Sequence, residues 1–344
     1  MKKYFEPRYH EYLDDNEPVF WSGQRYPSGQ AFQDHAPDDY QVSLTEFVQT
    51  QQEDARDRVR EMLTDNGCLR RFNRLAERHQ EREVLPFIGA GMSRPSGFPM
   101  WGSFLCELAQ NDAEVLDRVE TAIEEGRFSD AAQIISDEID ANILGEQVEN
   151  YFAGQVFTPV GPIRLVPELF KSGCITTNFD HVLEKVFEEN EEKFQQVFAG
   201  SQIIAAPRRS ANGENVLFKI HGTATSQVDR VLTTSEYDAA YGNARTVPGT
   251  LNVLISNRSL LFLGCSLVTD RTITAMQEIK QQNGVATLRH YAFLKDPGQA
   301  NRNARHAELQ QAEIHPIWYP VEDETTDHDA CIEDLLVALD GGPL

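Results

Sequence analysis

Cysteine is scarce in this sequence and is nowhere clustered. The 344 residues include five cysteines, which stand far apart at Cys68, Cys106, Cys174, Cys265 and Cys331. No two of them form a Cys-x-x-Cys pair, so a local zinc ribbon is excluded and a disulfide framework is not expected. The sequence therefore predicts no metal site, and it predicts a reducing cytoplasm as the location.

Long hydrophobic runs are also missing. No apolar stretch approaches the roughly 18 residues that a membrane helix needs, and the residues from Met1 to Glu6 lack the apolar region of a secretory signal. Hydrophobic residues still make up 40% of the chain, which is enough for a core. We expect a protein that makes no contact with membranes.

Basic residues are few relative to acidic ones. The chain has 31 lysines and arginines against 54 aspartates and glutamates, and its formal net charge is −23. Such a charge repels the phosphates of nucleic acids. Direct nucleic acid binding is therefore not expected, whereas a basic protein partner is compatible with this charge.

A glycine-containing turn follows the first apolar run of the chain. Residues Val84 to Ile88 have the pattern of a buried parallel strand, and Gly89-Ala90-Gly91-Met92-Ser93 comes directly after them. A helical pattern begins near Ser103. A strand, a glycine turn and a helix can present backbone N–H groups to a phosphate. However, Arg94 stands where a dinucleotide fingerprint has its third glycine, so an ordinary tight turn remains an alternative for this stretch.

The first 82 residues are expected to form a helical N-terminal extension. Residues 1–42 are polar and rich in turns, and they are either a disordered tail or a surface whose aromatic residues dock on another surface. That surface belongs to the same subunit or to a neighbouring one, and docking on a neighbouring subunit predicts an oligomer. A capping box at Ser43 to Glu46 predicts the start of a helix that ends near Gly67, and a further helix includes Leu69, Phe72 and Leu75.

Residues 83–344 are expected to form an α/β domain with a Rossmann-like parallel sheet. Helical spacing at about 103–170 predicts a helical subdomain inserted after the first strand. Short apolar runs then predict strands at 173–177, 196–198, 216–220, 260–263, 291–294 and 314–318. The segment 206–213 is predicted as a loop, and the acidic segment from Val321 onward as a solvated face.

Distinctive residues follow four of these strands. They are Gly89 to Ser93, Thr177 to Asp180, His221-Gly222, and Gly264-Cys265-Ser266. Each has a structural explanation alone, because Asp180 can cap a helix, a single histidine is often structural, and Gly-Cys-Ser can be only a turn. Ligands of open parallel sheets bind at the carboxyl ends of the strands, so the joint occurrence indicates one binding site.

This set of motifs resembles the sirtuin family. Sirtuins carry Gly-Ala-Gly-x-Ser, Thr-Gln-Asn-Ile-Asp, His-Gly and Gly-Thr-Ser in this order. Here Gly89 to Ser93 match fully, Thr176 to Asp180 keep Thr-x-Asn-x-Asp, His221-Gly222 is present, and Gly264 and Ser266 match. The resemblance covers about residues 84–340.

The departures from the sirtuin pattern point to a particular branch. Deacylating sirtuins hold zinc with two Cys-x-x-Cys pairs after the histidine, and this chain has none. The segment that would shape a peptide groove is replaced by Thr233 to Tyr237. These features look like the zinc-less sirtuin-like proteins of bacterial anti-phage defence, which hydrolyse NAD. That resemblance implies NAD as the substrate, and it allows a HerA-type ATPase or translocase as a partner.

Residue chemistry assigns roles within such a site. Cleavage of the nicotinamide–ribose bond needs a held substrate, a positioned water and polar groups on the ribose hydroxyls. Asn178 and His221 are the predicted catalytic pair, with Asn178 as the orienting amide and His221 as the proton acceptor. The remaining predicted contacts to NAD come from Gly89, Ala90, Gly91, Ser93, Asp180, Gly264 and Ser266. Cys265 is expected to be a core residue, and the role of Asp270 is open.

We therefore expect an NAD glycohydrolase that forms ADP-ribose and nicotinamide as the NAD-depleting effector of an anti-phage system. Two alternatives remain. The first is an NAD-dependent deacylase or ADP-ribosyltransferase, which the missing zinc cysteines disfavour. The second is a non-catalytic module that binds NAD or ADP-ribose, which the presence of Asn178 and His221 disfavours.

Overall fold

A seven-stranded parallel sheet forms the centre of the computed structural model, which describes residues 1–211, 213–242, 247–268, 271–283, 288–321 and 327–344. The strand order is β5-β6-β4-β3-β7-β8-β9, and every pair is parallel. The strands are β3 (Val84–Ile88), β4 (Cys174–Thr176), β5 (Gln196–Ala199), β6 (Val216–Lys219), β7 (Ser259–Leu263), β8 (His290–Lys295) and β9 (Ile314–Tyr319). This confirms the predicted α/β fold class.

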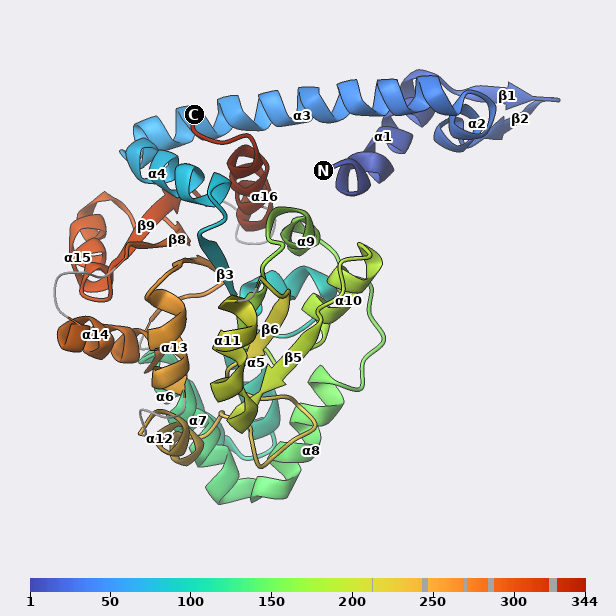
Figure 1. Ribbon diagram of the computed structural model, residues 1–344. Coiled ribbons are helices and arrows are strands. Elements are labelled where there is room, and N and C mark those ends of the chain that lie inside the picture. The colour runs from blue at the N-terminus through green and yellow to red at the C-terminus, as the bar shows by residue number, and fades with distance from the viewer. Residues whose placement is uncertain (212, 243–246, 269–270, 284–287, 322–326) are drawn as a thin grey trace.

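The central strands are apolar because helices cover the sheet on both sides (Figure 1). Every residue of β3 and β7 is buried, and Phe87 of β3 lies in register with Ile175 and Phe262 of its two neighbours. Such strands read as continuous hydrophobic runs, which is why the sequence predicts them well.

The order of the strands reverses at β3. The chain first adds β4, β6 and β5 on one side of β3, and it then crosses to add β7, β8 and β9 on the other side. In an open parallel sheet this reversal point is where the ligand crevice forms. The turns that follow β3 and β7 meet at this point.

The insertion between β3 and β4 is helical, as predicted. Its helices are α5 (Trp101–Ala109), α6 (Ala113–Glu124), α7 (Phe128–Ile135), α8 (Ala141–Phe152) and α9 (Val166–Leu169). Helices α6 to α8 lie beyond the carboxyl end of the sheet, next to α12 (Thr234–Tyr241) (Figure 1). Trp101 of this insertion packs edge-on against Phe179, which follows β4, with ring centroids 5.1 Å apart.

The other helices of this part are α10 (Val182–Glu189), α11 (Ala206–Ala211), α13 (Val247–Ile255), α14 (Arg271–Asn283), α15 (Gln299–Gln310) and α16 (Asp327–Asp340). The prediction of a loop at 206–213 is wrong, because α11 occupies 206–211. Pro207 is compatible with this helix, because proline is tolerated in the first turn, where its missing N–H has no partner to lose.

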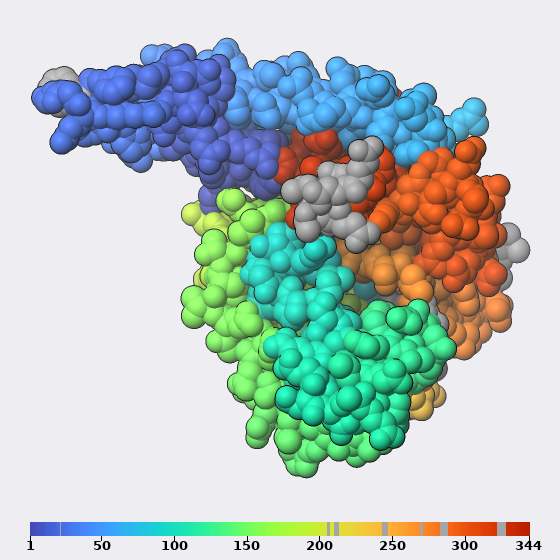
Figure 2. Space-filling model, turned by 180° about the vertical axis from the view of Figure 1, so that it is seen from behind, coloured from blue at the N-terminus to red at the C-terminus, as the bar shows by residue number. Residues whose placement is uncertain are grey.

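The first 82 residues form an arm, whose first part projects from the body while its last helix lies on the body near β3 and β9 (Figures 1 and 2). Its elements are α1 (Lys2–Asn16), a hairpin of β1 (Val19–Trp21) and β2 (Gln24–Tyr26), α2 (Ser28–His35), α3 (Pro37–Asp65) and α4 (Leu69–Gln80). The disordered-tail alternative for residues 1–42 is therefore wrong. Phe20 and Tyr26 at the tip remain exposed, at 63% and 43%.

The start of α3 differs from the prediction. The helix begins at Pro37, with Asp38 and Asp39 in its first turn, so the proposed capping box at Ser43 lies inside it. Proline fits the first helical position and acidic residues favour the positive helix N-terminus. The Ser43 hydroxyl accepts a hydrogen bond of 2.6 Å from Tyr9 of α1 instead.

The arm is anchored on α16. Arg8 of α1 pairs with Glu333 through both nitrogens, and Arg58 of α3 binds Asp334 in the same way, at 2.8 and 2.7 Å. We expected the acidic C-terminal segment to be only a solvated face. That expectation is wrong for Glu333 and Asp334. Each has an arginine partner on the arm.

Candidate functional site

The structure brings the four predicted motifs together. They follow β6, β4, β3 and β7, which are consecutive neighbours in the sheet. All four strands are parallel, so their carboxyl ends meet at one edge. Asp270, whose role was open, lies outside the described residues.

The glycines at this edge face each other across the reversal point. A Cβ on Gly89 would lie 2.5 Å from the carbonyl oxygen of Gly264, and one on Gly91 would lie 2.9 Å from the same oxygen. Gly264 itself has φ +66°, and a Cβ there would lie 2.5 Å from the nitrogen of Met92. The structure thus requires these glycines for backbone packing between two turns.

Several backbone N–H groups of the glycine turn are already used inside the protein. Gly89 donates to Leu263, Gly91 to Gly264 at 3.0 Å, and Met92 and Ser93 donate within the turn. A pyrophosphate would have to replace these bonds or lie beside them. The assignment of Gly89, Ala90, Gly91 and Ser93 to the pyrophosphate stays a prediction.

Asn178 is held between β4 and the glycine turn. Its backbone N–H donates to the Thr176 hydroxyl at 3.0 Å, and its Nδ2 donates to the Ser93 hydroxyl at 3.1 Å. The side chain is 4% exposed, and its Oδ1 has no hydrogen-bond partner among the described residues. A buried amide oxygen without a donor is costly, so this atom is suited to receive a donor from a ligand.

Asp180 follows two residues later and supports the same loop. Its Oδ1 accepts a hydrogen bond of 3.0 Å from the N–H of Val182, so it caps the start of α10, as one interpretation of the sequence predicted. Burial raises the pKa of Asp180, while the nearby positive charge of Lys219 opposes that rise.

His221 lies after β6 and contacts two tyrosines of α12. Its Nε2 shares a hydrogen bond of 2.7 Å with the Tyr241 hydroxyl, and the Tyr237 hydroxyl lies 3.5 Å from Nδ1. Tyr241 in turn shares a bond of 3.0 Å with Thr272 of α14. Burial lowers the pKa of His221 to about 3. The imidazole is therefore neutral at neutral pH. In this conformation it acts as a hydrogen-bonding group for Tyr241.

Sequence reasoning missed the two tyrosines as site residues. They stand four residues apart on α12, so they share one face of the helix, and their rings stack at 5.6 Å. A capping box at Thr233 and Glu236 fixes the start of α12. The spacing of the tyrosines was the available signal, but nothing in the sequence indicated which histidine they would meet.

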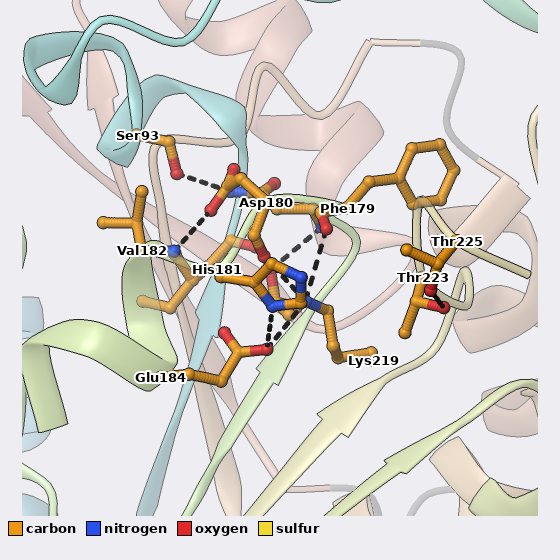
Figure 3. Close-up of polar contacts among 12 residues, drawn as sticks. Ser93, Phe179, Asp180, His181, Val182, Glu184, Lys219, Thr223 and Thr225 are labelled. Carbon is orange, nitrogen blue, oxygen red and sulfur yellow. Dashed lines mark hydrogen bonds and ion pairs between the residues drawn. The ribbon is translucent and has the colours of Figure 1, made fainter. Parts of the chain in front are cut away.

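Sequence reasoning also missed Lys219, the last residue of β6. Figure 3 shows its ammonium group between the loop after β4 and Glu184 of α10. Glu184 also contacts His181 at 3.0 Å. Burial alone would raise the pKa of Glu184, but Lys219 and His181 together lower it to about 2.

The turn after β7 is less enclosed. Ser266 is exposed, and Arg305 of α15 donates to its carbonyl and to that of Leu267 at 2.6 Å. The thiol of Cys265 lies 3.8 Å from the Phe87 carbonyl oxygen. A Cβ on Gly89 would lie only 2.6 Å from the same sulfur atom. This position between two turns agrees with a packing role for Cys265.

The core of the site is closed in this conformation. Ser93, Asn178 and His221 are each at most 5% exposed. A substrate as large as a dinucleotide can reach them only if covering side chains move.

Residues 172–317 match the sequence family described as SIR2-like domain. This part of the chain is therefore similar to SIR2-like domains. This confirms the resemblance to sirtuin-like proteins that the motifs predicted. The match includes Asn178, His221 and Gly264, whereas the glycine turn after β3 lies outside it.

Curated relatives resemble the chain at low identity. A protein named NAD(+) hydrolase ThsA from Cytobacillus dafuensis is 25% identical over 65% of this chain and 43% of its own length. Its namesake from Acinetobacter baumannii is 22% identical over 67% and 46%. Defense-associated sirtuin 2 from Bacillus subtilis is 20% identical over 60% of this chain and 20% of that protein. The chain thus spans less than half the length of these relatives.

Two further observations concern metal ions and membranes. Within the described ranges, no group of three or more His, Cys, Asp or Glu side chains is placed to hold a metal ion. In the same part of the chain, no helix is both long and apolar enough to cross a membrane.

Proposed function

We propose that the SIR2-like domain hydrolyses NAD to ADP-ribose and nicotinamide. The observation that carries the proposal is the placement of Asn178 and His221 after the neighbouring strands β4 and β6, on the side of β3 at which the strand order reverses. The names of the relatives agree with this reaction, although none exceeds 25% identity.

The reaction breaks the bond between the ribose anomeric carbon and the nicotinamide nitrogen. Nicotinamide leaves with the electron pair, a water oxygen bonds to the carbon, and the water proton is released. The positive charge that develops on the ribose is stabilised by oriented dipoles in a site that excludes bulk water. The unpaired Oδ1 of Asn178 is suited to accept a ribose hydroxyl or the attacking water.

His221 supplies the second oriented group. As a neutral imidazole it can accept a hydrogen bond from a ribose hydroxyl or from water, provided that the bond to Tyr241 is exchanged. Asp180 orients the loop that carries Asn178, and we propose that Gly264 and Ser266 contact the adenosine side.

The decisive test is to incubate the purified protein with NAD and to follow free nicotinamide and ADP-ribose. Equal release of both products, lost in His221→Ala, is the expected result. Transfer of ADP-ribose to protein, or deacylation of an acylated peptide, would favour the first alternative. Measurable NAD binding without any product would favour a binding module.

We also propose a role in anti-phage defence, acting as an NAD-depleting effector with a HerA-type partner. The support is the name of a defence-associated relative together with the motifs. Infected cells that express the chain should lose NAD, whereas cells that express His221→Ala should retain it. Unchanged NAD in both would contradict this role.

A further inference from the structure

We propose that Lys219 is a positioning residue that holds the Asn178 loop in its reactive geometry. This inference rests on the proposed function and adds to it a residue that the motifs do not include. Lys219 ends β6, and its side chain is 1% exposed. His221 follows two residues after Lys219.

The ammonium group of Lys219 is fully committed to the loop and its helix. It donates to the carbonyl of Asp180 at 2.6 Å, to the carbonyl of Phe179 at 3.4 Å, and to Glu184 at 3.0 Å (Figure 3). A lysine has three donors, so all of them are used here. These two carbonyls bind one cation, so Lys219 fixes the peptide groups that follow Phe179 and Asp180, one and two residues after Asn178.

These contacts complete a set of restraints around Asn178. Thr176 binds the loop from the β4 side at the Asn178 N–H, Asp180 binds it to the first turn of α10, and Lys219 holds it from β6. Lys219 and His221 lie two residues apart at one strand end, so the lysine links the Asn178 loop to the segment that carries His221.

Stability alone does not explain a lysine at this position. A buried ion pair is weak evidence for stability, because desolvation of two charges offsets most of their attraction. Glu184 even leaves its second oxygen, Oε2, without a partner among the described residues. The buried ammonium group can orient the loop by donating hydrogen bonds to its carbonyls. An apolar side chain at this position could not donate them.

The test compares Lys219→Met with two controls. Lys280→Met is the control for removal of a lysine with the same kinds of partner, because Lys280 donates to the carbonyl of Gln310 at 3.0 Å and pairs with Glu313 at 2.6 Å away from the site, although its side chain is 32% exposed. Glu184→Gln keeps the hydrogen-bonding shape but removes the charge partner.

Two quantities are measured for each variant. Amide hydrogen exchange of residues 177–182 should become faster in Lys219→Met and stay unchanged in Lys280→Met. The kcat for nicotinamide release should fall roughly a hundredfold in Lys219→Met with little change in KM, because a small misplacement near the reacting atoms has effects of that size. Glu184→Gln should keep slow exchange and most of the turnover.

Several outcomes would overturn the proposal. Unchanged exchange in Lys219→Met would do so, as would an unchanged kcat, or a loss in Glu184→Gln equal to that in Lys219→Met. If the wild type releases no nicotinamide, the NAD function fails, and hydrogen exchange alone decides whether Lys219 holds the loop.

Lys219→Met removes the ammonium partner of the buried Glu184 and leaves it only His181, so a second variant guards against a failure to fold. Lys219→Met combined with Glu184→Leu removes both charges, and it should fold while still showing fast loop exchange and low turnover. If neither variant folds, Lys219 is needed for the fold as a whole and the positioning role is refuted.

Discussion

The pH dependence of turnover offers the sharpest check on the role of His221. Burial holds the pKa of this imidazole at about 3 in the free protein. The kcat/KM for NAD reports groups of the free enzyme. A histidine with a pKa of about 3 is almost entirely neutral at pH 5, so its protonation should not reduce kcat/KM between pH 8 and pH 5.

An ordinary histidine would behave differently. With the unperturbed pKa of about 6.5, only about 3% of it would be neutral at pH 5, and kcat/KM would fall about thirtyfold from its value at pH 8. The two expectations thus differ by more than a factor of ten at one pH. Initial rates of nicotinamide release at NAD concentrations far below KM measure this difference directly.

The protein must remain folded over the range, which circular dichroism at each pH checks. A flat profile supports a neutral, hydrogen-bonding His221 closed under Tyr241. An acid limb with a midpoint near 6.5 that disappears in His221→Gln would refute the reasoning. It would show that the imidazole titrates in an opened, solvated site.

Four further predictions follow from the same structure. Asn178→Ala and His221→Ala should each lower nicotinamide release by roughly a hundredfold or more, and non-additively, while calorimetry still detects NAD binding. Acid should destabilise the fold, because His221 and His290, both with a pKa lowered to about 3, bind protons only when unfolded; each costs about 2 kcal/mol at pH 5, and thermal melts from pH 7 to 5 should show it. Replacing exposed Phe20 and Tyr26 by serine should reduce the mass seen by light scattering, and a wild type that is already monomeric contradicts the predicted oligomer. Metal analysis should find far less than one zinc per chain, since about one would revive the deacylase alternative.

The parallel sheet was predictable because its strands are buried on both faces. Val84 to Ile88 and Ser259 to Leu263 are continuous apolar runs, and their lengths match strands better than helices. The arm was less predictable. The Ser43 motif has the form of a helix start, but Pro37 and the acidic residues after it begin the helix earlier, and packing against α1 keeps Ser43 inside.

The candidate site was predictable only in part. Motifs at strand ends identified Asn178 and His221, because one edge of a parallel sheet collects such residues. The partners of these residues were not predictable. The contact of Tyr241 with His221 and that of Lys219 with the Phe179 and Asp180 carbonyls join segments that the chain separates by 20 to 40 positions. Only the folded geometry decides which of several tyrosines and lysines reach them.

The glycines show how one motif can support two physical explanations. Read from the sequence, Gly89 and Gly91 lack side chains so that a pyrophosphate can approach; in the structure, the carbonyl of Gly264 already occupies the space that a Cβ would need. A substitution at either glycine would therefore displace the turn after β7 whether or not NAD binds there. Loss of activity in such a variant cannot separate folding from ligand binding. Substitution of His221 separates the two better, because its side chain bonds Tyr241 and Tyr237 of α12, whereas Asn178→Ala also removes the bond to Ser93 in the glycine turn.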